Sequence, residues 1–396
     1  MRNTFFTCLA VCLSMGSPVN AQDDQGSVLY SAGTVYTMSG APLSPGQVLI
    51  RDGKIAAVGA TLPADTVGDA TQVELGPDSV LMPGFIDAYT QTGMESGKPD
   101  EQSKEVTPRF QAIHAVDWKS DGIQKQLHDG TTTMCICPGT ENVIAGISGI
   151  VKTAGEHVIN DNHALVASLC SDPASRNSSR QRPDSIYVRQ PTNRMGVVWI
   201  LRNTLSKESR DLDAANPVDQ VLEGKRPLFM VSRVSHDLTT VATLADEFDL
   251  QPVVVGGQES YLVTDLLAER KYPVILSGTT TGSMFGPEQS KLCWNQAGIL
   301  DAADIPFAIS GSQLLEQARF ACRFGLEREK ALQAITVSPA KILGIDNKVG
   351  TIETGKDADL VALNGDPLEF TTAIEWVMVD GKIQDGQNTK RESKGN

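Results

Sequence analysis

Strand-like and helix-like segments alternate along the middle of the chain, between residues 82 and 345. Alternation of this kind favours a parallel sheet whose strands are joined by crossover helices. The region is long enough for a TIM-like (β/α)8 barrel, which takes roughly 250 residues. A doubly wound open sheet is the alternative, because periodicity does not distinguish a closed sheet from an open one. The apolar strand-like runs are TTTMCICP, PLFMVS, PVVVG, YPVILSG and IPFAISG.

Both ends of the chain have a different pattern, that of short antiparallel strands. Alternating apolar runs flank the dipeptide Asp52-Gly53 near one end and Asp380-Gly381 near the other. Asp-Gly between such runs predicts a hairpin. We therefore expect the two ends to build one small β-sandwich domain together. The predicted segments are 22–81 with 346–388 for this domain, 82–345 for the barrel and 389–396 for a polar tail.

Residues 1–21 have the pattern of a secretory signal peptide. Arg2 precedes an apolar run at residues 5–15, and small residues precede a predicted cleavage site after Ala21. A membrane anchor is the alternative, but the run is shorter than the roughly 20 residues that span a bilayer. A lipoprotein cysteine at Cys12 is a second alternative, which the bulky residue before it disfavours. No later segment is long enough to span either, so we expect an exported protein, periplasmic or extracellular.

The composition excludes two classes of protein. The chain has 34 Lys and Arg residues against 48 Asp and Glu residues, a formal net charge of -14. So negative a chain repels a phosphate backbone, and we expect no nucleic-acid partner. Five of the seven cysteines follow the predicted signal peptide, an odd number that is small for the length. The sequence therefore does not predict a disulfide-stabilised scaffold.

Three segments resemble the amidohydrolase superfamily of metal-dependent hydrolases. VLMPGFIDAYTQTG at residues 80–93 is similar to the start of that family's barrel, where the motif reads PGxIDxHxH. ITVSPAKILGIDNKVGTIETGKDADLVAL at residues 335–363 is similar to its last helix and its return into a composite β-domain. The segment GTTTMCICPGTENVIAGISGIVKTAG resembles the branch related to imidazolonepropionase. The resemblance implies the same barrel and composite domain that the strand pattern predicts.

The resemblance also implies a divalent metal at the carboxyl-terminal mouth of the barrel, held first by two histidines at i and i+2 of one strand. The chain has Tyr89 and Gln91 at those positions. A phenol and a neutral amide are poor substitutes for two imidazoles. No histidine follows His236, and no aspartate lies between Asp304 and Asp346, so a shifted alignment does not restore the ligands. The other ligand positions fall at Val231 or Arg233, at Gly256, and at Ser310 or Ser312.

Three further residues have a side chain that metal or family chemistry could use. Lys152 is either a remnant of the family's lysine ligand or a structural or surface lysine. Cys135 and Cys137 lie on one face of a predicted strand, as a ligand pair would. Packing inside the barrel is the alternative for both cysteines, because no second Cys or His pair completes a tetrahedral site.

We expect a protein that has lost metal-dependent hydrolysis, with no catalytic residue, metal or cofactor. It is predicted to bind a small molecule in the barrel mouth at Tyr89, Gln91, Arg233 and Ser312, where the Arg233 fork would hold a carboxylate. A protein partner is the other expectation, either a second copy or a related active subunit. The alternative function is hydrolysis of non-peptide carbon–nitrogen bonds by a metal-independent or partner-assisted site. A purely structural subunit is a third class.

Overall fold

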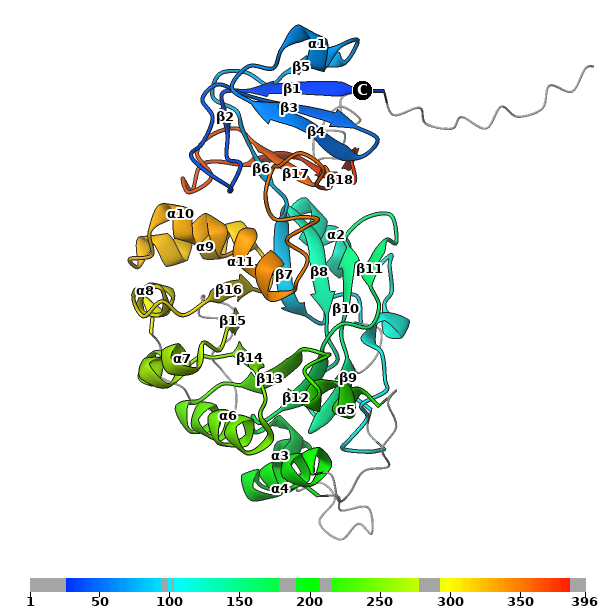
Figure 1. The fold of residues 1–396 in the computed structure, drawn as a ribbon, viewed down its shortest axis with the longest axis vertical. Coiled ribbons are helices and arrows are strands. Elements are labelled where there is room, and N and C mark those ends of the chain that lie inside the picture. Colours follow the sequence, from blue (N-terminus) through cyan, green and yellow to red (C-terminus); the bar gives the residue numbers. More distant parts are fainter. Residues whose placement is uncertain are drawn as a thin grey trace, which may run out of the picture.

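The first and last parts of the chain lie together at one end of the molecule, above a larger α/β part (Figure 1). The computed structural model describes residues 26–94, 99–101, 103–177, 190–206, 216–277 and 293–384. The predicted signal peptide and the predicted polar tail lie outside the described residues. No helix among the described residues has the length and apolar character needed to cross a membrane.

One sheet of the β-rich end is formed by the N-terminal part of the chain alone, in the order β4-β3-β1-β5. Strands β3 and β4 pair antiparallel across Asp52-Gly53, whose φ angles are 50° and 73°. Two successive positive φ angles suit a tight hairpin turn, as the sequence predicted. The strands are β1 Val28–Ala32, β3 Gly46–Arg51, β4 Lys54–Gly59 and β5 Thr71–Glu74, and helix α1 Ala64–Val67 precedes β5.

The second sheet joins both ends of the chain, in the order β19-β18-β17-β6-β2. Strand β6 pairs antiparallel with β17, so a strand near residue 80 lies beside one near residue 360. A shared core that includes Tyr30, Val48, Leu81, Leu360 and Met378 packs the two sheets together. The strands are β2 Thr34–Val35, β6 Val80–Pro83, β17 Leu360–Leu363, β18 Ile374–Val379 and β19 Lys382–Gln384. The exact domain boundaries stay predictions.

The α/β part contains two sheets. The first has the order β11-β10-β8-β7, with β7 and β8 parallel and β10 antiparallel to β8. The second has the order β16-β15-β14-β13-β12-β9, and its strands run parallel from β12 to β16. The strands are β7 Phe85–Thr90, β8 Thr131–Ile136, β9 Ile144–Ile147, β10 Gly149–Lys152, β11 Val158–Asn160, β12 Leu165–Ser168, β13 Leu228–Ser232, β14 Pro252–Gly256, β15 Val274–Ser277 and β16 Phe307–Ser310.

These two sheets are arcs that meet at both ends, although no backbone ladder between them is detected among the described strands. At one junction only Ser148 separates β9 from β10. At the other, the chain before helix α11 lies between β16 and β7. The Ile309 N–H donates to the Ala334 carbonyl and the Ile86 N–H donates to the Ile335 carbonyl, each at 2.9 Å. The enclosed space is filled by apolar side chains that include Ile86, Val166, Phe229, Val253, Ile275 and Ala308.

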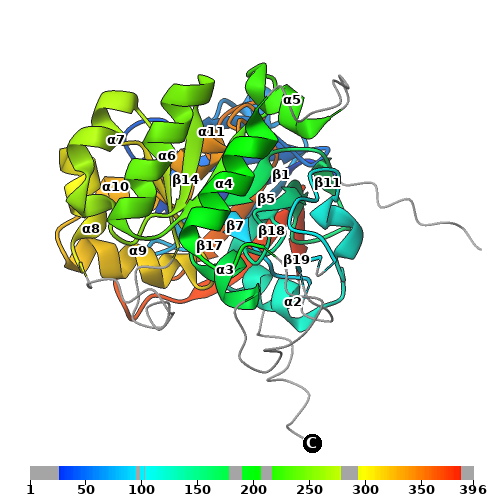
Figure 2. The same cartoon turned by 90° about the horizontal axis from the view of Figure 1, so that it is seen from below.

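Helices cover the outside of the parallel strands. Figure 2 shows α6, α7, α8 and α9 on one side of the strands and α2 on the other. Strand and helix alternate from β12 to α9, which is the order the sequence predicted. The helices of this part are α2 Asp121–His128, α3 Asp172–Asn177, α4 Arg194–Leu205, α5 Pro217–Leu222, α6 Ser235–Phe248, α7 Thr264–Arg270, α8 Gln296–Ala302, α9 Leu314–Arg323, α10 Arg328–Gln333 and α11 Val337–Ile342, with short 3-10 turns η1 Ala112–Ala115 and η3 Ser260–Leu262.

Candidate functional site

The candidate site lies where the parallel strands end, at the carboxyl end of β7, β12, β13 and β16. Parallel barrels place ligands at this end, because the variable loops that follow the strands gather there. Tyr89 lies near the end of β7, and its hydroxyl is buried without a hydrogen-bond partner among the described residues. Burial raises the pKa of Tyr89 well above its usual value, and the nearby Cys137 and Cys170 raise it further while Arg233 lowers it. The phenol is therefore neutral and available as a donor or an acceptor.

The backbone of Tyr89 is fixed by Ser310 at the end of β16. The Tyr89 N–H donates to the Ser310 hydroxyl at 2.9 Å, and the same hydroxyl lies 2.9 Å from the Tyr89 carbonyl oxygen. The Ser310 hydroxyl also donates to the Asp87 carboxylate. This group of contacts links the first strand of the α/β part to the last.

Asp87 is the centre of that link, and the sequence analysis passed over it. Its carboxylate is fully buried and accepts from the Gly311 N–H at 3.0 Å and from the Gln126 side chain at 3.4 Å. Burial raises the pKa of Asp87 to about 6, although the hydrogen bonds from Ser310 and from the backbone oppose the shift. Its place in the motif IDxHxH was the available signal. Its contacts bind strands together, which is a structural role.

The guanidinium of Arg233, which follows β13, is already paired with a carboxylate of the chain. Its two terminal nitrogens donate to the two carboxylate oxygens of Asp172 at 2.8 and 2.7 Å. Thr140 donates to the same carboxylate at 2.5 Å. Burial alone would raise the pKa of Asp172, but Arg233 and Thr140 outweigh it and the pKa is lowered. The guanidinium that was expected to hold a ligand's carboxylate is thus paired with a carboxylate of the chain itself, and the binding role of Arg233 stays a prediction.

The other two predicted binding residues are less engaged. Gln91 is half-buried, and its side-chain nitrogen lies 3.5 Å from the Pro138 carbonyl, which is a weak contact. Ser312 is exposed, and its carbonyl accepts from Gln317 at 2.8 Å. Of the two serines that the sequence offered at this strand end, Ser310 is the one that contacts β7. The binding roles of Gln91 and Ser312 stay predictions.

The cysteines near this site are buried thiols. The sulfur atoms of Cys135 and Cys137 are 3.8 Å apart, and Cys170 lies 2.9 Å from the Ser168 hydroxyl. Burial raises the pKa of Cys170 to about 12 and that of Cys137 well above its usual value. Across the described parts of the chain, no group of three or more His, Cys, Asp or Glu side chains could hold a metal ion. The donor set does not fit the divalent metal that the resemblance implied.

Lys152 is a structural lysine and lies away from the mouth. It is fully buried at the end of β10, and its ammonium nitrogen lies 2.5 Å from Asp359, 3.0 Å from Asp357 and 3.4 Å from Asp380. Burial alone would lower the pKa of Lys152, but the three carboxylates outweigh it and the pKa is raised. All three aspartates belong to the C-terminal strands and turns. These pairs support the structural alternative for Lys152.

A cavity of about 300 Å³ opens beside the mouth, between the end of β12 and the start of α6. We call it the rim cavity. Arg194 spans one wall, where it pairs with Asp237 and donates to the His236 carbonyl at 2.8 Å. The sequence analysis missed Arg194, since its partners are more than 40 residues away. The polar side chains of the rim cavity are those of Cys170, Ser171, Ser175, Thr192, Arg194, His236 and Asp237.

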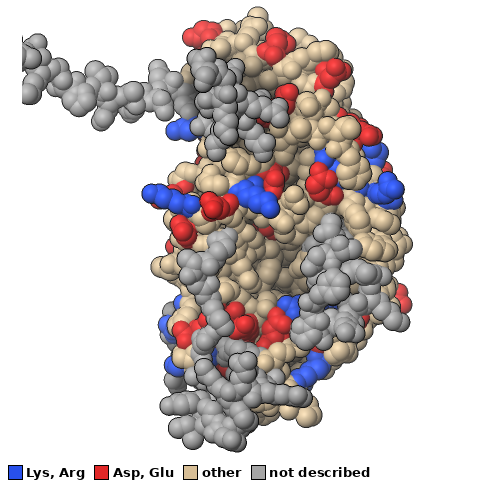
Figure 3. All heavy atoms as spheres, turned by 180° about the vertical axis from the view of Figure 1, so that it is seen from behind, with Lys and Arg blue, Asp and Glu red and all other residues tan. Residues whose placement is uncertain are grey.

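The charged side chains on the surface do not indicate whether a partner would be acidic or basic. Figure 3 shows acidic and basic side chains interspersed on the face that it draws. Ion pairs such as Arg202 with Glu247 and Arg270 with Asp246 account for some of the mixed surface.

Comparison with known proteins shows similarity to one family. A model described as "Amidohydrolase family" matches residues 294–386. The chain is 24% identical to amidohydrolase tasK of Hapsidospora irregularis over 86% of this chain and 40% of that protein. It is 39% identical to an imidazolonepropionase of Sphingopyxis alaskensis over 20% of each chain. The chain thus spans less than half the length of these two curated relatives.

A solved structure gives a likeness over almost the whole chain. The crystal structure of an amidohydrolase from Thermotoga maritima superposes with a TM-score of 0.81 at 26% identity, covering 91% of this chain and 100% of that one. This likeness confirms the predicted fold class, a TIM-like barrel with an additional domain. The resemblance drawn from the three sequence segments is confirmed by the same comparisons.

Proposed function

We propose that this chain, which belongs to the amidohydrolase superfamily, is an exported protein that binds a small molecule at the barrel mouth and no longer performs metal-dependent hydrolysis. One observation carries the proposal. The first-strand position that the resemblance assigns to a histidine holds Tyr89, whose neutral phenol is buried and unpartnered among the described residues. A phenol so placed does not hold a divalent cation at neutral pH, but it can hydrogen-bond a ligand.

The surroundings of Tyr89 support binding over metal chemistry. Arg233 and Asp172 neutralise each other, and the neighbouring thiols are protonated, so the site carries little net charge. A buried polar group without a partner costs free energy, which a ligand's hydrogen bond would recover. The rim cavity supplies room of about 300 Å³ and several hydroxyl groups beside this site. A small, polar and uncharged ligand suits that lining.

The first test is the metal content of the purified mature protein, measured by elemental analysis after dialysis without a chelator. We expect substoichiometric zinc, iron, manganese and nickel. A thermal-shift screen of small polar molecules follows, with Tyr89→Phe as the matched variant, because it removes only the phenol oxygen. A ligand of the site should stabilise the parent protein more than the variant. About one tightly held transition metal per chain would overturn the proposal.

The alternative is a hydrolase of non-peptide carbon–nitrogen bonds, by a metal-independent site or with groups supplied by a partner. The two curated relatives carry hydrolase-type names, an amidohydrolase and an imidazolonepropionase, which favours this alternative. Turnover of amides or cyclic amides by the metal-free protein, alone or after mixing with a related active subunit, would support it. Size-exclusion chromatography with light scattering tests whether a second copy or such a subunit binds.

Export is a separate part of the proposal. It depends on residues 1–21, with their single early positive charge, apolar run and small residues before the cleavage site. N-terminal sequencing of the protein recovered outside the cytoplasm should begin at Gln22. An N-terminus at Met1 in that fraction would contradict it.

A further inference from the structure

An ion pair between Arg233 and Asp172 lies at the carboxyl ends of the parallel strands, where the candidate site is. Arg233 follows β13, and Asp172 begins α3 in the segment that follows β12. Thr140, in the segment that follows β8, donates to the same carboxylate at 2.5 Å. The side chains of Arg233 and Asp172 are 26% and 19% exposed, so a solute can reach them. The pair therefore belongs to the mouth and not to the packed interior.

The geometry of this pair is the one by which arginine recognises a carboxylate. The two terminal nitrogens of Arg233 lie 2.8 and 2.7 Å from the two carboxylate oxygens of Asp172. Paired hydrogen bonds of this kind are charge-assisted, and each is roughly twice as strong as a hydrogen bond between neutral groups. Asp172 thus occupies the position that the carboxylate of a ligand would take at Arg233.

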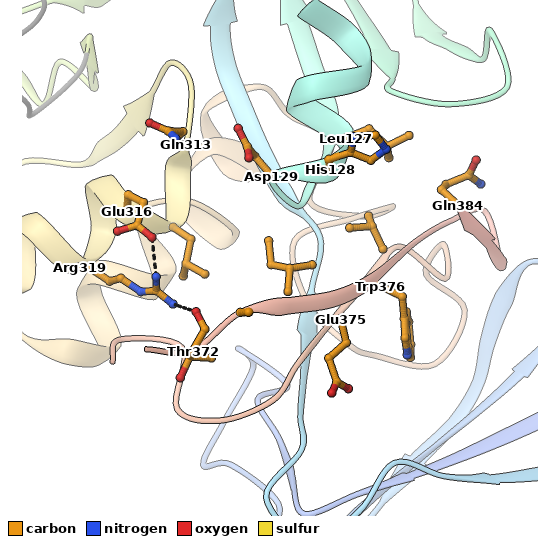
Figure 4. A pocket seen from close by; sticks show the side chains of 14 residues that line it. Leu127, His128, Asp129, Gln313, Glu316, Arg319, Thr372, Glu375, Trp376 and Gln384 are labelled. Carbon is orange, nitrogen blue, oxygen red and sulfur yellow. Dashed lines mark hydrogen bonds and ion pairs between the residues drawn. The ribbon is translucent and has the colours of Figure 1, made fainter. Parts of the chain in front are cut away.

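An arginine elsewhere in the molecule shows the contrast. Arg319 lines a cavity of about 240 Å³ against strand β18 of the β-rich end. Its guanidinium donates to the Pro367 carbonyl at 2.8 Å, and Figure 4 shows its contacts with the Thr372 carbonyl, at 2.9 Å, and with Glu316. Its nitrogens are divided among three groups and do not make a double contact with one carboxylate. Burial of an arginine beside a cavity therefore does not by itself produce the arrangement found at the mouth.

The charge of Asp172 affects which ligands can approach. Burial alone would raise its pKa, but Arg233 and Thr140 outweigh burial and lower the pKa, so the carboxyl group is ionised at neutral pH. A ligand carboxylate at Arg233 would lie next to this negative charge, and such repulsion discriminates against a ligand. An uncharged polar molecule meets no such repulsion. It can still hydrogen-bond the Tyr89 phenol, which has no partner among the described residues.

We propose that Asp172 sets the ligand specificity of the barrel mouth: it occupies the guanidinium of Arg233, excludes carboxylates and leaves the site to uncharged polar molecules. The inference rests on the small-molecule binding proposed above, and it adds the residue that determines which charge class is bound. Its consequence is that loss of the Asp172 charge converts the mouth into a carboxylate site.

Acetate is the probe for this conversion, and acetamide is its uncharged counterpart of similar size. Calorimetric titration of the full chain, at constant ionic strength in sodium chloride, measures both. Asp172→Asn should bind acetate at least about tenfold more tightly than the parent does, because two hydrogen bonds from a charged guanidinium become available. The response to acetamide should be the same in both proteins. The double variant Asp172→Asn with Arg233→Met should lose the gain.

Glu247→Gln is the matched control for charge alone. It removes the carboxylate that pairs with Arg202 on the outer surface, between α6 and α4, so the net charge of the chain changes by the same amount as in Asp172→Asn. It should not gain acetate binding. The same gain in Glu247→Gln, or a gain that persists in the double variant, would assign the effect to net charge and overturn the proposal.

A second variant covers a loss of folding in Asp172→Asn. Asp172→Ala removes the whole carboxyl group and leaves space beside Arg233 for a small anion. Its thermal midpoint should fall below that of the parent and be restored by acetate but not by acetamide. No effect of acetate on either Asp172 variant, or saturable acetate binding by the parent, overturns the proposal. None of these outcomes alters the metal content of the parent, so a failure here is distinguishable from a failure of the proposed function.

Discussion

The Ser310 hydroxyl lies 2.9 Å from the backbone nitrogen of Tyr89, although 221 residues separate them in the sequence. This contact joins the end of β16 to the end of β7 at the place where no backbone ladder between these two strands is detected. One hydroxyl thus acts on three groups, the Tyr89 N–H, the Tyr89 carbonyl and the Asp87 carboxylate. These contacts hold the end of β16 next to the end of β7.

Substitution Ser310→Ala should lower the free energy of unfolding by about 1–3 kcal/mol, because the buried Asp87 carboxylate loses a donor. Ser312→Ala is the matched control, since Ser312 is exposed, and its effect should stay within about 0.5 kcal/mol. Urea unfolding followed by circular dichroism measures both. Equal effects of the two substitutions would show that the Ser310 contacts do not stabilise the fold.

Asp87 should make stability depend on pH in an unusual direction. Its pKa is raised to about 6 in the folded protein, so the folded state holds the proton more tightly than the unfolded state, where the carboxyl has its ordinary value of 3.8. Asp87 therefore contributes favourably to the free energy of unfolding at low pH, and this contribution is lost as pH rises from about 4 to about 6. As pH rises over that interval, the free energy of unfolding of the parent should therefore fall relative to that of Asp87→Asn. Denaturant unfolding at several pH values measures it, and a difference that does not vary with pH would contradict the raised pKa.

Lys152 should be required for stability. Lys152→Met leaves Asp357 and Asp359 close together and buried without their central cation, which should cost about 3–5 kcal/mol. Lys54→Met is the control, because Lys54 contacts Asp357 but is 54% exposed, and it should cost about 1 kcal/mol or less. Adding Asp359→Asn to Lys152→Met should recover part of the loss. No recovery in the double variant would place the cost in packing and not in charge.

Restoring histidine at both first-strand positions should not restore a metal site. In Tyr89→His with Gln91→His, two imidazoles would face a region where the later ligand positions hold Arg233 and Ser310, each already engaged within the chain. Elemental analysis after incubation with zinc should give substoichiometric metal, as in the parent protein. One zinc ion per chain in this variant would show that other ligands remain in place.

The sequence by itself determined the kinds of elements and the resemblance to the amidohydrolase superfamily. The period of the apolar residues distinguished the β-rich ends from the alternating middle, and Asp52-Gly53 predicted the β3–β4 hairpin that the structure contains. Such signals are local, because strand period and turn conformation depend on neighbouring residues. The replacement of histidine by Tyr89 and Gln91 was also a matter of sequence alone.

The tertiary structure decided which side chains meet. The sequence does not show whether the Arg233 guanidinium is paired within the chain. Only the fold brings Asp172 to it from 61 residues away. Lys152 could be assigned as structural only when three aspartates more than 200 residues later were found around it. The charge state of a buried group depends on distances across packed strands and helices, which the order of residues does not contain. For this reason the sequence indicated the candidate positions. It did not indicate which side chains contact them or which cavities lie beside them.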